Sequence, residues 1–267
     1  MTNGSLFPIF IFNRATSQFL SIHVEVIMNP TTRDLRVMTS GAFTAAYLEL
    51  IPRLEFLTKK KLVTVATSIG TGEMSIPNRL RRGEVVDVVI VADGVLLGFI
   101  KEGLIIAETY TPVARSAIGM AVRAGAPKPD IATVDGLKRT LLQAKSIGYS
   151  ASVSGQYLTT ELYQRLGIAD QVMGKSRLIG GGERVGAVIA RGEVEIGFQQ
   201  LSELLPIPGI AHVTPLPPEV QKVSAFSAGV ASATRDADAA RALTKFLASP
   251  EAAEAITKSG LEPIENR

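Results

Sequence analysis

The residues best suited to hold a ligand lie at three junctions, each between an apolar run and a segment with helical periodicity. Ser40 and Gly41 lie at the first junction, Ser68 and Thr71 at the second, and Ser154 at the third. A helix start leaves backbone N–H groups unpaired, and neighbouring hydroxyls add donors, so such a junction can bind a small anion. Three junctions of this kind predict that several helix starts converge on one site. The pattern indicates binding and does not by itself indicate catalysis.

Composition limits the chemistry that the chain can perform. The 267 residues include no cysteine and two histidines, His23 and His212. Thiolate catalysis, disulfides and zinc–sulfur sites are therefore excluded. Two histidines in unrelated segments also argue against a Ser-His-Asp triad or a multi-histidine metal site. We expect neither a metal nor a cofactor.

Charge and hydropathy argue against two classes of partner. The net charge is +3, and the densest basic clusters are residues 59–61 and 79–82. Neither cluster has aromatic neighbours at the spacing of a base-stacking surface, so nucleic acid is not an expected partner. No apolar window approaches the length of a membrane span, so membrane insertion is not expected.

Residues 1–27 form an atypical N-terminal extension. The apolar run at residues 7–12 is followed by Asn13 and Arg14 and lacks the order of a secretory signal peptide. As the sequence stands, we expect a cytoplasmic protein. Met28 is a plausible alternative start, and an incorrectly assigned start would hide a signal peptide and make the protein periplasmic.

The chain from residue 35 alternates short β-branched runs with helical segments, which predicts an α/β fold with parallel strands. The first set has strands at 35–38, 62–66 and 86–91 and helices at 44–57, 76–82 and 94–102. The second set has helices at 135–145, 155–166 and 183–191 and strands at 147–150, 176–179 and 194–199.

Two extended segments, at 110–122 and 222–231, connect these sets and predict two crossings between two α/β domains. The helices at 237–248 and 251–259 are expected to return to the first domain. We therefore assign residues 34–112 plus 225–267 to one domain and residues 113–224 to the other. A ligand in such an arrangement lies between the domains, at the carboxyl ends of the strands.

Five segments resemble the molybdate-binding periplasmic protein family, and the similarity spans residues 34–264. They are residues 39–43, 82–90, 153–157, 190–197 and 247–252. The resemblance implies a type 2 periplasmic-binding-protein fold, in which closure of two domains traps an anion. It also implies that helix-start hydroxyls, backbone N–H groups and a tyrosine hydroxyl bind the ligand.

The chain departs from that family where the ligand would be bound. Gly41 stands where the family usually has a serine, and Gln200 lies in the stretch that carries the family's tyrosine. Arg184 follows Gly182 at a helix start, and Arg115 lies on the first crossing. A guanidinium suits a planar carboxylate through two parallel hydrogen bonds, whereas a surface salt bridge is the alternative role for either arginine.

These departures resemble a branch of the family that includes aconitate isomerase, an enzyme on a binding-protein scaffold. Its reaction, as an allylic proton shift, needs carboxylate clamps and an acid or base near a carbon atom. Glu183, Asp93 and Tyr149 are the candidates here. Each also has a structural alternative: helix-start carboxylates for Glu183 and Asp93, and packing beside the hinge for Tyr149.

Two hypotheses for function follow. The first is a solute-binding protein that captures a small anion, a carboxylate rather than molybdate, and would deliver it to an ABC transporter permease if exported. The alternative is an isomerase on the same scaffold that acts on an unsaturated tricarboxylate such as aconitate. A regulatory effector-binding domain is weaker, since no helix-turn-helix precedes the fold.

Overall fold

The computed structural model describes residues 6–13, 18–25, 33–66, 68–70, 72–180 and 182–264. Contacts divide the chain into two units, Met1–Asp34 and Leu35–Arg267, which are described separately. In the first unit, strand β1 (Leu6–Asn13) pairs antiparallel with strand β2 (Gln18–Glu25). The apolar run at residues 7–12 therefore lies within a strand.

The second unit contains two sheets, and each sheet is the centre of one lobe. The first lobe has six strands in the order β13-β6-β12-β5-β3-β4. These strands are β3 (Leu35–Thr39), β4 (Leu62–Ala66), β5 (Val88–Ala92), β6 (Thr111–Ser116), β12 (Ser224–Val230) and β13 (Glu262–Pro263). Its helices are α1 (Gly41–Thr58), α2 (Ile76–Arg81), α3 (Asp93–Lys101), the 3-10 turn η1 (Ala107–Thr109), α10 (Ala237–Leu247) and α11 (Pro250–Lys258).

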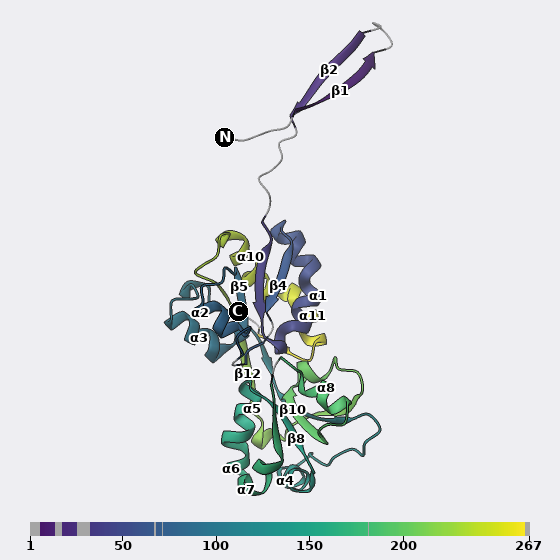
Figure 1. Ribbon diagram of the computed structural model, residues 1–267, viewed down its shortest axis with the longest axis vertical. Coiled ribbons are helices and arrows are strands. Elements are labelled where there is room, and N and C mark those ends of the chain that lie inside the picture. Colours follow the sequence, from purple (N-terminus) through teal and green to yellow (C-terminus); the bar gives the residue numbers. More distant parts are fainter. Residues whose placement is uncertain are drawn as a thin grey trace. The chain divides into compact units, whose positions relative to one another are not determined.

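Helices cover both faces of this first sheet (Figure 1). On one face α1, α10 and α11 bury apolar side chains such as Leu50 and Leu243. On the other face α2 and α3 bury Leu80 and Phe99. All five residues of β5 are buried, as expected for a strand covered on both faces. The C-terminal helices α10 and α11 thus share a core with α1 of the first lobe.

The second lobe has five strands in the order β11-β7-β10-β8-β9. These strands are β7 (Ile118–Arg123), β8 (Ile147–Ser150), β9 (Ser176–Ile179), β10 (Ile196–Gln200) and β11 (Ile210–Pro215). Its helices are α4 (Val134–Gln143), α5 (Val153–Tyr157), the π-turn η2 (Leu158–Leu162), α6 (Tyr163–Arg165), α7 (Ala169–Val172), η3 (Met173–Lys175), α8 (Val185–Ala190), α9 (Leu201–Leu204) and η4 (Pro218–Val220). The helix expected at 155–166 thus contains a π-turn.

Both sheets are mixed, which corrects the expectation of parallel sheets. The strands that belong to βαβ units do run parallel: β3 with β4 and β5, and β8 with β9 and β10. The strands next to the crossings do not. Strand β12 runs antiparallel to β5 and β6, and β7 runs antiparallel to β10 and β11. The chain reaches β7 and β12 directly from the other lobe. A helical crossover, the connection that makes neighbouring strands parallel, does not precede either strand.

Two glutamines join the crossings between the lobes. The chain changes sheets at Ala117, between β6 and β7, and again between β11 and β12. Gln221 on the second crossing bonds both main-chain groups of Ile118, accepting from its N–H at 2.9 Å and donating to its carbonyl at 3.0 Å. In the orientation that satisfies both ends of its amide, Gln200 donates to Ser116 Oγ at 2.9 Å and accepts from Ser224 Oγ at 3.2 Å.

Gly155 is required by the close approach of α5 to the end of β8. A Cβ on Gly155 would lie 1.7 Å from the carbonyl oxygen of Ser150. We expect Gly155→Ala to lower the free energy of unfolding by about 2–4 kcal/mol, because backbone must move to relieve the overlap. Gly98→Ala in α3 is the matched control, since a Cβ there has no neighbour within 4 Å. Urea denaturation would measure both, and equal stability of the two variants would contradict the prediction.

Candidate functional site

The first predicted junction places an unpaired hydroxyl at the start of a long helix. Ser40 is the N-cap residue of the 18-residue helix α1, and its side chain makes no capping hydrogen bond. The Ser40 main-chain N–H donates to the Ile90 carbonyl at 2.8 Å, which fixes the junction against β5. Ser40 Oγ is buried and has no hydrogen-bond partner among the described residues. The hydroxyl is therefore available to a ligand beside the positive end of the helix.

A carboxyl group of the second lobe lies directly against this helix start. A Cβ on Gly41 would be 2.2 Å from Glu203 Oε1, so only glycine leaves room for the carboxyl in this position. Gln199 Nε2 donates to the same oxygen at 2.9 Å. We call Ser40, Gly41, Gln199, Ser202 and Glu203 the interlobe junction.

Three buried polar atoms of this junction lack hydrogen-bond partners among the described residues. They are Ser40 Oγ, Gln199 Oε1 and Ser202 Oγ. Buried polar atoms are nearly always satisfied, and leaving one unsatisfied costs about 1–3 kcal/mol. A bound polar molecule would satisfy those of these atoms that it reaches.

The environment of Glu203 favours the neutral acid. Burial raises the pKa of the Glu203 carboxyl to about 7, although the charge of Arg184, the Gln199 amide and the Gln200 backbone N–H each act to lower it. Desolvation disfavours the charged form, and here its effect exceeds that of the neighbouring donors. A carboxyl with this pKa can gain or lose a proton near neutral pH. The chain has no cysteine and two histidines, so few other side chains can do the same.

The third predicted junction carries a chain of hydroxyls that faces the first lobe. Ser150 Oγ lies 2.7 Å from Ser152 Oγ, which lies 3.1 Å from Ser154 Oγ. Ser154 is fully buried in the first turn of α5, and the neighbouring Val153 packs against the core of the first lobe. The structure therefore brings this junction to the boundary between the lobes.

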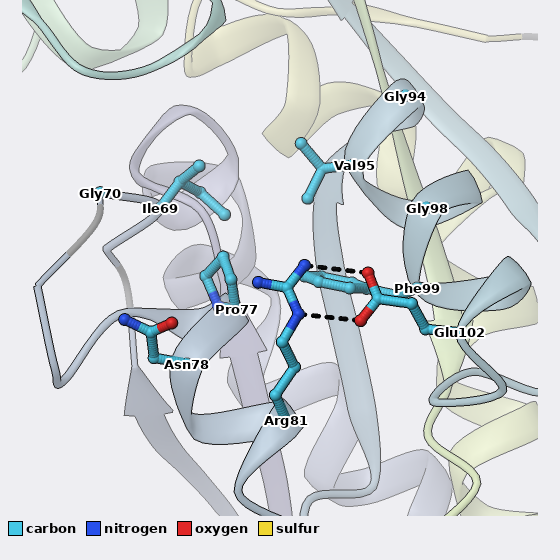
Figure 2. Close-up of a pocket in the computed structure, with 10 residues that line it drawn as sticks. All are labelled: Ile69, Gly70, Pro77, Asn78, Arg81, Gly94, Val95, Gly98, Phe99 and Glu102. Carbon is cyan, nitrogen blue, oxygen red and sulfur yellow. Dashed lines mark hydrogen bonds and ion pairs between the residues drawn. The ribbon is translucent and has the colours of Figure 1, made fainter.

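In the second junction, Ser68 forms hydrogen bonds to nearby residues of the same segment. Thr71 lies outside the described residues. Ser68 Oγ accepts from the Gly70 N–H at 3.3 Å, and the Ser68 carbonyl accepts from Ile76 N at 2.8 Å. Next to it, α2 and α3 line a pocket of about 380 Å³ that also includes Ile69 and Gly70 (Figure 2).

This pocket belongs to the first lobe and offers no unpaired cation to an anion. Figure 2 shows Arg81 and Glu102 joined across it by two hydrogen bonds, of 2.8 and 2.9 Å. The hydrogen bonds to Glu102, and then its charge, raise the pKa of the Arg81 guanidinium. The hydrogen bonds from Arg81 lower the pKa of Glu102, so both groups stay ionised and paired. The remaining wall contains apolar or small side chains such as Val95 and Phe99. The interlobe junction is therefore the better candidate for an anion site.

Two of the three predicted catalytic candidates already have strong polar partners. Asp93 is the first residue of α3 and does not cap it; its Oδ1 accepts from Tyr110 OH at 2.6 Å and from Ser227 Oγ at 2.7 Å. Glu183 is exposed and forms an ion pair with Arg191 at 2.5 Å. Both carboxylates thus act as hydrogen-bond acceptors within their own lobes.

The other predicted residues lie in varied surroundings. Tyr149 is partly buried in β8 and packs on the second-lobe core. Arg115 is paired with Glu262 at 3.7 Å, which fits the salt-bridge alternative. Gly182 has a left-handed backbone (φ 83°) just before α8. Gln200 is buried and bonded to the crossings, so it has a structural role whether or not it touches a ligand.

Arg184 keeps the placement that the sequence suggested. It is the exposed N-cap residue of α8, and no ion pair joins it to another described residue. Its positive charge acts to lower the pKa of the Glu203 carboxyl, against the larger effect of desolvation. Arg184 lies at the start of α8, whereas Glu203 lies against the start of α1.

Sequence analysis missed Glu203. The residue lies three positions after Gln200 in the run Leu201–Leu205, where it is the one charged residue between leucines. A lone carboxylate in an apolar stretch directly after a buried strand is the signal that would have identified it. The position that carries the family's tyrosine predicts Gln200 instead.

The geometry agrees with the comparisons to known proteins. A family model described as bacterial extracellular solute-binding protein matches residues 35–262. The chain belongs to this family. Its fold is the two-domain solute-binding fold of the ABC-transporter substrate-binding type. Among the described residues, no helix is long and apolar enough to cross a membrane.

The chain resembles three known proteins to different degrees. The chain is 43% identical over 231 residues to an aconitate isomerase from Pseudomonas sp, covering 86% of this chain and 88% of that protein. A periplasmic molybdate-binding protein from Azotobacter vinelandii has a TM-score of 0.72 at 16% identity, covering 88% of this chain and 100% of the other. The sulfate-binding protein SubI from Mycobacterium tuberculosis has a TM-score of 0.67 at 16% identity, with 87% of each chain covered. At these identities the two structures support the fold alone.

The raised pKa of Glu203 makes stability depend on pH. Below its ordinary pKa of 4.5 the carboxyl is neutral in both the folded and unfolded states and carries no penalty. Between pH 4.5 and about 7 the unfolded state ionises first, so stability falls as pH rises. We expect Glu203→Gln to be more stable than wild type at pH 8 by on the order of 2–3 kcal/mol and nearly equal to it at pH 4.5.

Urea denaturation at pH 4.5, 6 and 8 would test this expectation. Glu219→Gln, an exposed carboxyl on the same lobe, is the matched control and should follow the wild-type pH dependence. If Glu203→Gln followed the wild type as well, the carboxyl would not be buried as described.

Proposed function

We propose that this protein is an isomerase that interconverts cis- and trans-aconitate in the region between its two lobes. The observation that carries the proposal is the 43% identity to the Pseudomonas aconitate isomerase, which extends over 231 residues and so includes elements of both lobes. Identity at this level over nearly the whole chain supports more than a common fold.

The donors around the interlobe junction suit a tricarboxylate. Ser40 Oγ and the N-terminal N–H groups of α1 would bind one carboxylate, and the Arg184 guanidinium, which has no ion pair with any residue that the structure describes, would clamp another. The hydroxyl chain from Ser150 to Ser154 would supply further neutral donors. A proton shift also requires an acid or base, and the junction contains a carboxyl.

The activity can be tested directly. Purified protein mixed with cis-aconitate should produce trans-aconitate, and the reverse, until one equilibrium mixture is reached from either side, as followed by proton NMR. Because the proposed reaction consumes nothing else, no added metal or cofactor should be needed after treatment with a chelator. A protein that binds aconitate and leaves both isomers unchanged would contradict the proposal.

Passive solute binding is the second candidate, favoured by the family description and by the transporter-type neighbours. In that case a small carboxylate would be captured and, for an exported form, passed to an ABC transporter permease. A thermal-shift screen with molybdate, tungstate, sulfate, citrate and both aconitates distinguishes the candidates at the level of binding, since a ligand of the folded state raises Tm. Stabilisation by molybdate or tungstate alone would favour an oxyanion binder.

Arg184 should separate carboxylate binding from oxyanion binding. We expect Arg184→Ala to weaken aconitate binding by about 10- to 100-fold, because a charge-assisted pair to a carboxylate is lost. Any binding of molybdate should change little, since dehydrated oxyanions are held by neutral donors. Isothermal titration calorimetry would measure both constants.

Arg177→Ala is the matched control for this experiment. Arg177 is an exposed arginine of the same lobe, paired with Glu193 at 3.3 Å, and its loss should leave aconitate binding within about twofold of wild type. Equal losses of aconitate and molybdate affinity in Arg184→Ala would refute a role specific to carboxylates.

A further inference from the structure

We propose that Glu203 is the proton-transfer residue of this protein, removing a proton from the methylene carbon of aconitate and returning one to the former vinyl carbon. This inference deepens the proposed function and rests on it. Glu203 lies on α9 of the second lobe, and its carboxyl would transfer the proton at the start of α1 in the first lobe.

The position of the carboxyl carries the inference. Glu203 Oε1 lies against Gly41, at the helix start that is best suited to hold a substrate carboxylate. The unpaired Ser40 hydroxyl lies one residue away from Gly41. A substrate anchored there would present its neighbouring carbon to a carboxyl that is already in place.

The carboxyl is also oriented by its own neighbours. Gln199 Nε2 donates to Oε1 at 2.9 Å, which orients the carboxyl. Arg184 at the start of α8 supplies the charge that acts on the group, and the first turn of α1 contains no acidic side chain. A substrate carboxylate bound at the start of α1 therefore meets no acidic side chain from the first turn of that helix.

The other carboxylates considered are less able to transfer a proton. Asp93 accepts two short hydrogen bonds from Tyr110 and Ser227, both in the first lobe. Glu183 is held by Arg191 in an exposed ion pair. The oxygens of those two carboxylates are therefore already engaged by donors. Desolvation raises the pKa of the partly buried Glu203 to about 7, close to the working pH that general acid–base catalysis favours.

The proposed proton shift needs no co-reactant. The methylene C–H bond breaks, its proton passes to the Glu203 carboxylate, and its electron pair forms a double bond to the central carbon. The electrons of the old double bond then form a C–H bond at the former vinyl carbon with a proton from the Glu203 carboxylic acid. Negative charge that develops on the adjacent carboxylate is stabilised by Arg184 and the α1 N–H groups. Nothing is oxidised or reduced.

The test compares wild type with Glu203→Gln and Glu203→Asp. The glutamine variant retains the shape and the acceptor for Gln199 but cannot take a proton, so kcat should fall at least about 100-fold while the Kd for trans-aconitate, measured by calorimetry, stays within about threefold. Glu203→Asp should retain part of the activity. In wild type, kcat/KM should increase with pH through a single ionisation near pH 7, and Glu219→Gln should keep the wild-type kcat and pH profile.

Exchange in D₂O separates this inference from the proposed function. Wild type should introduce deuterium into aconitate recovered from the reaction, and Glu203→Gln should not. A Glu203→Gln variant that isomerises with wild-type kcat would overturn the role of Glu203 and leave the proposed function standing. A wild-type protein that binds aconitate but neither isomerises nor exchanges it would overturn both.

Discussion

The double passage of the chain between its two sheets is the constraint on which the rest of the structure depends. Because β6 continues into β7 and β11 returns to β12, neither lobe can move without bending both connections. The Gln200 and Gln221 amides join these connections by hydrogen bonds, so the two strands of the hinge act as one unit. Motion between the lobes is then confined to the hinge, as in other hinged two-domain binders.

This constraint also explains why the functional groups meet. The parallel strands of each sheet end near helix starts, and the hinge directs the starts of α1 and α5 toward the boundary between lobes. Glu203 is brought to α1 because α9 begins immediately after β10, at the same end of the second sheet. The interlobe junction therefore combines a hydroxyl and N–H groups from the first lobe with a carboxyl from the second.

Local sequence patterns predicted most of the fold. The β-branched runs at 62–66 and 147–150 form strands with those bounds. Strand direction was not predictable for β7 and β12, because it depends on how the lobes are connected and not on periodicity. Ser40 was predicted from helix-start chemistry and Arg184 from the match between a guanidinium and a carboxylate. Glu203 draws attention through its approach to the distant Gly41, which residue type alone does not reveal.

The close contact between Gly41 and Glu203 has a consequence for how relatives of this protein can diverge. A side chain at position 41 would displace the Glu203 carboxyl. A shorter residue at position 203 would leave room for a side chain at position 41. The effect of a change at either position therefore depends on the residue at the other, so the two sites are epistatic. A serine at position 41 would require the Glu203 side chain to adopt another conformation, which would move its carboxyl away from the start of α1.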